Sequence, residues 1–120
     1  AWGRFNHLHP PFDNPRIRRA LMGAISQADY MIAVTGTDRS LWRENVGFFP
    51  PGTPFASDAG IDVLKGPRDL DKVRREIEAA GYRGERVVLL AATDLPSLHA
   101  LGQVGNDMLK KCGLNVDYVA

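Results

Sequence analysis

The residue types at one junction near the end of the chain could hold a small polar molecule. Thr93 and Asp94 directly follow an apolar run, and an amphipathic helix pattern begins after Leu95. A hydroxyl, a carboxylate and the free N–H groups of a helix start can together bind a polar or zwitterionic ligand. Asp94 would favour an ammonium group, whereas the N–H donors would favour a carboxylate. Spacing alone leaves a second interpretation open, in which Thr93 or Asp94 only caps the helix.

A strand, a crossover helix and a second strand must position this junction. The continuous run Val-Val-Leu-Leu-Ala-Ala predicts a strand over residues 85–92, of the kind that is covered on both faces. A second strand is expected over 114–119, and the helix between the two makes them parallel. We therefore predict an α/β fold with a small open sheet, a βαβ unit and packed helices. Thr93 and Asp94 would then lie at the carboxyl end of a strand, where open α/β sheets usually receive ligands.

Helix boundaries are marked clearly in the earlier part of the chain. Asn14 can cap a first helix, which begins with the proline that follows it. Ser26 can cap a short second helix that ends at Gly36. Asp69 starts a later helix. The apolar positions of residues 1–8 predict a short, poorly defined strand.

A long segment without sustained periodicity, residues 37–67, separates the second helix from the third. It holds four of the eight prolines and four of the twelve glycines, together with Trp42, Phe48, Phe49 and Phe55. Irregular segments of this length are uncommon in compact domains and are often functional. The 120 residues are expected to form a single partial domain.

Composition narrows the class of function. A formal net charge of +1 gives no reason to expect nucleic acid or an anionic membrane as a partner. No apolar run approaches the roughly 20 residues of a membrane span. The single cysteine, Cys112, sits at an apolar helix position and predicts a buried structural thiol. His7, His9 and His99 lack a metal-ligand or nucleophile–base pattern, so we expect no metal, no cofactor and no catalytic residue.

Several stretches together resemble a known family, the periplasmic solute-binding proteins of the peptide- and nickel-binding class. Residues 5–21 contain Phe-Asn, a spacer, Pro-Phe-Asp, and then Ile-Arg-Arg-Ala-Leu. The Ala-Ile-Ser at 24–26 continues this match. Pro-Phe at 54–55, Glu-Ala-Ala-Gly-Tyr at 78–82 and the Met-Leu-Lys-Lys-Cys-Gly-Leu-Asn-Val within 101–118 follow in the family's order.

The resemblance implies that the chain is a piece of a longer protein. Members of this family are several times longer and close two lobes on a solute, and this chain matches only part of the second lobe. It implies a periplasmic receptor that binds a peptide or another small polar solute and delivers it to the membrane permease of an ABC-type importer. Thr93, Asp94 and Leu95 would line the cleft, and Phe48 and Phe49 could add an apolar wall.

Two other functions stay open on the residues themselves. One is a small α/β hydrolase or transferase that uses Asp94. The other is an interaction domain whose exposed patch consists of the four aromatic residues of segment 37–67. An isolated lobe piece would also expose an unpaired strand edge, so a homodimer is expected.

Overall fold

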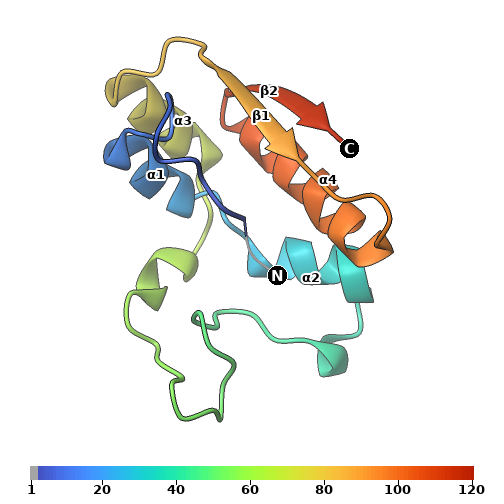
Figure 1. The fold of residues 1–120 in the computed structure, drawn as a ribbon. Coiled ribbons are helices and arrows are strands. Elements are labelled where there is room, and N and C mark those ends of the chain that lie inside the picture. The colour runs from blue at the N-terminus through green and yellow to red at the C-terminus, as the bar shows by residue number, and fades with distance from the viewer. Residues whose placement is uncertain (1–2) are drawn as a thin grey trace.

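Helices and one pair of strands carry the regular structure of residues 3–120, the part of the chain that the computed structural model describes. The elements are α1 (Pro15–Met22), α2 (Gln27–Thr35), α3 (Leu70–Ala79), β1 (Arg86–Leu90), α4 (Pro96–Lys111) and β2 (Asn115–Val119). Two short 3-10 helices, Arg39–Leu41 and Ile61–Leu64, interrupt the predicted irregular segment. Figure 1 shows α1 and α3 side by side and α4 along the strands. The irregular segment extends away from these two groups of elements.

The two strands are parallel, as the βαβ pattern predicts. Their register runs from Arg86 opposite Asn115 to Leu90 opposite Val119. Because α4 connects them and packs on one face of the pair, the predicted α/β fold with a βαβ unit is confirmed. No helix in residues 3–120 combines the length and the apolar character that crossing a membrane requires.

The other face of the strand pair is uncovered, which corrects the prediction of a strand buried on both faces. Val88 is 47% exposed, Leu90 75% and Val119 44%. The apolar run predicts two-sided burial, but within residues 3–120 the helices lie on one face of the strands and leave these side chains exposed. The strand predicted over residues 1–8 is also wrong for residues 3–8, which form coil and turns. Ala1 and Trp2 lie outside the described residues.

One hydrophobic core joins the α1–α3 pair to the βαβ unit. Its buried members share the inward faces of these elements and include Ile17, Leu21, Val73, Ile77, Val87, Leu109, Cys112 and Leu114. Phe12 packs there too, with its ring 4.5 Å from that of Phe5 between centroids. The core thus fixes where the α1–α3 pair sits relative to the strands.

The helix starts predicted from capping residues are confirmed. The side chain of Asn14 accepts a hydrogen bond from the Arg16 N–H, and Ser26 does the same for the Asp29 N–H. Asp69 caps α3 through the N–H of Lys72. These bonds satisfy N–H groups that the first turn of a helix leaves without an intrahelical partner. At the end of α2, Gly36 adopts a φ of 94° and its N–H bonds to the Ile32 carbonyl.

A glycine in the middle of α4 allows the helix to approach the strands closely. A Cβ placed on Gly102 would lie 2.5 Å from the Cβ of Ala91 and 3.1 Å from the Tyr118 hydroxyl. At Gly105 the nearest atom would be the Tyr30 hydroxyl at 3.5 Å, an ordinary contact. Of the two glycines inside α4, Gly102 is therefore the one that the packing against the strands requires.

Candidate functional site

The turn between β1 and α4 places Thr93, Asp94 and Leu95 together on the surface. All three are exposed. Leu95 is the N-cap of α4, and no side chain caps this helix. The interpretation in which Thr93 or Asp94 only caps the helix is therefore wrong. The chain bends through a turn here, so neither side chain reaches the N–H groups of the first helical turn.

Hydrogen-bond donors and an acceptor remain available at this turn. The first intrahelical bond of α4 is donated by the His99 N–H to the Leu95 carbonyl, at 3.0 Å. Pro96 has no N–H, so the unpaired donors of the first turn belong to Ser97 and Leu98. Within residues 3–120, no hydrogen bond or ion pair involves the Asp94 carboxylate. The turn therefore has one free anion beside the positive end of a helix dipole.

The aromatic residues of the irregular segment form a separate cluster. The rings of Phe48 and Phe49 pack edge to face at 5.0 Å between centroids, and Phe49 lies 5.6 Å from Phe55. Phe48 is 76% exposed and Phe55 74% exposed. The fourth member of the predicted patch, Trp42, does not join them. It is half-buried, and its indole N–H donates to the Gly36 carbonyl at 3.0 Å.

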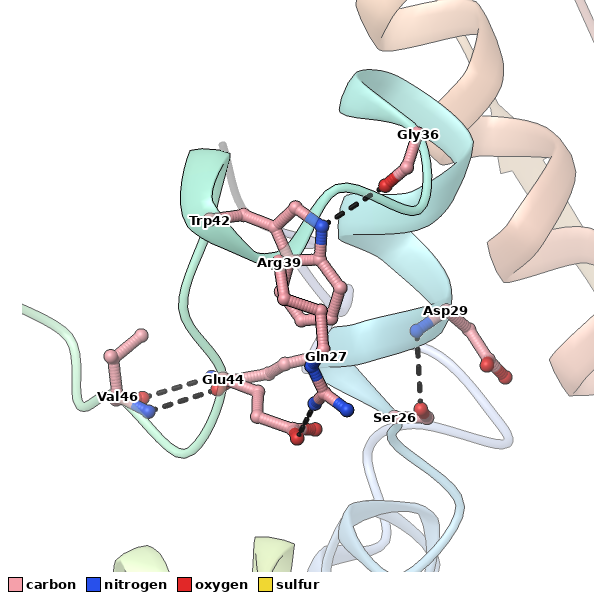
Figure 2. A network of polar contacts seen from close by, with 8 residues as sticks. All are labelled: Ser26, Gln27, Asp29, Gly36, Arg39, Trp42, Glu44 and Val46. Atoms are coloured by element: carbon pink, nitrogen blue, oxygen red, sulfur yellow. Dashed lines mark hydrogen bonds and ion pairs between the residues drawn. The ribbon is translucent and has the colours of Figure 1, made fainter.

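Polar contacts to α2 hold the start of this segment in place (Figure 2). The side chain of Gln27 donates to the Val46 carbonyl at 2.8 Å and accepts from the Val46 N–H at 2.9 Å. Arg39 lies over the Trp42 ring at 5.0 Å and pairs with Glu44 at 2.5 Å. These contacts anchor residues 36–46 against α2, and the phenylalanine cluster follows directly after Val46.

The structure does not bring the aromatic cluster to the Thr93–Asp94 turn. The turn lies at the end of the strands, whereas the cluster belongs to the segment that extends away from α2 (Figure 1). Phe48 and Phe49 as an apolar wall of the same site remain a prediction. A single solute that touched both the turn and the aromatic cluster would have to span the space between them. Otherwise, another part of a longer protein would have to complete each of the two sites.

A shallow groove between α2 and α4 was not foreseen from the sequence. Ile32, Ala33 and Val104 supply its apolar lining, and Asp29 and Asp107 its acidic one. Both acids are already paired, Asp29 with Arg68 at 3.1 Å and Asp107 with Lys111 at 2.7 Å. Since neither carboxylate is left uncompensated, the groove has no free charge with which to select a charged solute.

The remaining chemical groups belong to the core or to the surface. Cys112 is buried as predicted, and burial raises the pKa of its thiol. A raised pKa lowers the thiolate fraction, so this cysteine is a poor nucleophile. His7 and His9 are exposed. No group of three or more histidine, cysteine, aspartate or glutamate residues in 3–120 is arranged to hold a metal ion.

Comparison with known proteins places these features in a family. The family model described as bacterial extracellular solute-binding proteins, family 5 (Middle), matches residues 2–120. A relative from Sinorhizobium fredii (strain NBRC 101917 / NGR234), named "Probable peptide ABC transporter periplasmic-binding protein y4tO", is 27% identical over 114 residues. The match covers 95% of this chain and 21% of that relative, so the chain spans about a fifth of its length. The chain belongs to the family 5 bacterial extracellular solute-binding proteins.

Proposed function

We propose that the chain is part of the solute receptor of an ABC-type importer. The receptor binds a peptide or another small polar solute between two lobes and delivers it to the membrane permease. The observation that carries the proposal is the family match over residues 2–120. The name of the relative from Sinorhizobium fredii supports a peptide as the solute. In this role the chain is a periplasmic binding module and not an enzyme.

The Thr93–Asp94–Leu95 turn is the part of this chain that best suits solute binding. It combines a carboxylate that has no partner within residues 3–120 with the free N–H groups at the start of α4. The carboxylate suits the ammonium group of a peptide or amino-acid-like solute, and the N–H groups suit a carboxylate. Both are exposed in this chain, so another part of the receptor must close over them. Hinge closure of two lobes around a solute provides that second wall.

Ligand-induced thermal stabilisation of the full-length receptor tests the proposal. A panel of di- to pentapeptides would be compared with free amino acids, sugars and nickel salts. Binding to the native state raises the melting temperature by mass action. We expect a peptide to give the largest shift, and Asp94→Ala to weaken its binding by about tenfold or more, since a charged hydrogen bond contributes about 1.5–3 kcal/mol.

Glu78→Ala is the matched control, since Glu78 is exposed on α3 and its carboxylate has no partner within residues 3–120. It removes the same charge from a place far along the chain from the turn, and we expect peptide affinity to be unchanged. Equal losses in both variants would refute the site assignment. If no peptide shifted the melting temperature while another solute did, the peptide proposal would be wrong and the receptor role would stand.

The aromatic cluster has a separate place in the proposal. Phe48 and Phe49 contribute an apolar wall to the solute site of the closed receptor, from a segment that lies apart from the turn in this chain. Phe49→Ala should then weaken binding of peptides with large apolar side chains more than that of glycine-rich peptides. A uniform loss, or none, would remove Phe49 from the site. A homodimer of the 120-residue chain, formed through an unpaired strand edge, is also proposed, and light scattering tests it.

A further inference from the structure

The strand pair has one covered and one bare face. Three side chains in and just after β1 point toward α4, namely those of Val87, Leu89 and Ala91. Val87 is buried, a Cβ on Gly105 would contact Leu89, and a Cβ on Gly102 would contact Ala91. Since side chains alternate along a strand, Arg86, Val88 and Leu90 point the opposite way. The parallel register then places Asn115, Asp117 and Val119 of β2 on that same opposite face.

The bare face is divided into a polar and an apolar half. At the amino end of the strands, Arg86 forms an ion pair with Asp117 across the sheet. At the carboxyl end, Leu90 lies opposite Val119, with Val88 beside them. These three side chains are 75%, 44% and 47% exposed, respectively. The apolar half is thus a continuous patch beside the proposed solute site.

This patch is unusual for a parallel sheet. Parallel sheets occur almost only with both faces covered, because the crossover connections place helices against them. Burying one leucine and two valines contributes favourably to folding, whereas leaving them in water contributes nothing. Among residues 3–120, α4 is the helix that packs most extensively on the strand pair, and α1 and α3 join the covered face through the core around Val87 and Leu114. The sequence of β1 is therefore suited to a second covering element, and residues 3–120 do not supply one.

We infer that the patch formed by Val88, Leu90 and Val119 is covered by a helix from a part of the full-length receptor outside residues 1–120. The chain spans 21% of the relative from Sinorhizobium fredii, so a protein of that length has ample chain to supply one. The inference rests on the proposed receptor role, because it requires a longer parent protein. The covering helix uses an apolar side on the patch and leaves the Arg86–Asp117 pair at its rim.

Thiol labelling of the full-length receptor, without solute, tests the cover. Leu90→Cys and Arg75→Cys are made in a protein whose cysteines outside residues 1–120 are replaced by serine. Native Cys112 is buried and supplies a slow background. Arg75 is exposed on the polar side of α3 and serves as the accessible control. We expect Leu90→Cys to react with Ellman's reagent at least about tenfold more slowly than Arg75→Cys, since it reacts only after local opening.

A photo-crosslinker identifies what covers the patch. Leu90→Cys, combined with Cys112→Ala so that denaturation exposes no second thiol, is loaded under mild denaturation with a benzophenone maleimide, refolded and irradiated, and the captured peptide is read by mass spectrometry. We expect a peptide from outside residues 1–120, in a yield that does not change on dilution. Capture of a second copy, or of a peptide within 1–120, would overturn the inference, as would labelling as fast as that of Arg75→Cys.

Two further measurements keep the test decisive. Val119→Cys reports on the same patch from the other strand, so it replaces Leu90→Cys if the latter does not refold. Solute binding is measured separately by the thermal shift of the unmodified receptor. A receptor that binds no peptide can still show the cover, and one that binds peptide can still lack it, so the two proposals fail independently.

Discussion

Replacing Gly102 by alanine should destabilise the protein, whereas the same replacement at Gly105 should stabilise it. Both glycines lie inside α4, where alanine is favoured over glycine by about 0.8–1 kcal/mol. Helix propensity alone therefore predicts the same gain at both positions. Packing against the strands distinguishes them, because a Cβ on Gly102 would meet the Ala91 Cβ at 2.5 Å, and one on Gly105 meets nothing closer than 3.5 Å.

The expected magnitudes follow from these distances. Carbon atoms pack best at about 3.5–4.0 Å, so helix and strand must separate by about 1 Å to admit the methyl group at Gly102. Ala91 cannot easily move aside, since its N–H donates to the Val119 carbonyl at 3.0 Å. Overpacking of this kind costs about 1–3 kcal/mol. The net loss for Gly102→Ala is then up to about 2 kcal/mol, against a gain of up to about 1 kcal/mol for Gly105→Ala.

Urea unfolding followed by far-ultraviolet circular dichroism measures both variants. The midpoint should fall for Gly102→Ala and rise for Gly105→Ala with an unchanged slope. Ala91→Gly removes the opposing methyl group, so Gly102→Ala should cost less in that background, and the double-mutant cycle isolates the contact. If Gly102→Ala proved as stable as Gly105→Ala, the close approach of α4 to β1 would be wrong.

Three further predictions concern the cap of α1, the hydrogen bonds between Gln27 and Val46, and the buried thiol of Cys112. Asn14→Ala should cost about 2 kcal/mol in urea unfolding, because Asn14 both caps α1 and donates to the Ala80 carbonyl at 2.8 Å. Asn14→Ser keeps the cap and should lose about half as much; equal losses would contradict the contribution of the cap, and no loss in Asn14→Ser would contradict that of the second bond. Gln27→Ala should speed hydrogen exchange at the Val46 amide about tenfold without lowering global stability by more than about 1 kcal/mol. Unchanged exchange would mean that the Gln27–Val46 hydrogen bonds do not hold residues 36–46. Burial raises the pKa of Cys112, so the unfolded thiol ionises first and stability should fall as pH rises past about 8.5. Cys112→Ala should remove that slope from melting curves recorded between pH 7 and 10, and a slope that persists would assign it to another group.

Local signals in the sequence are sufficient to predict a structural feature when that feature depends only on residues that are close together in the chain. Asn14, Ser26 and Asp69 each cap the helix that they were predicted to cap, because a cap needs only a side-chain oxygen and an N–H two or three residues on. The parallel strand pair follows from the order of strand, helix and strand. Family membership also follows from the motifs, since these carry spacing over the whole chain.

Contacts between distant segments could be found only in the tertiary structure. The Val-Val-Leu-Leu-Ala-Ala run indicates that both faces of β1 are suited to burial. Whether a face is in fact buried depends on which other elements lie against it, and one face of β1 is exposed. At the Thr93–Asp94 junction, the sequence by itself determined the residue types and their place after a strand. Only the fold decided that neither residue caps α4 and that the Asp94 carboxylate has no partner within residues 3–120, because both depend on the path of the turn and not on spacing.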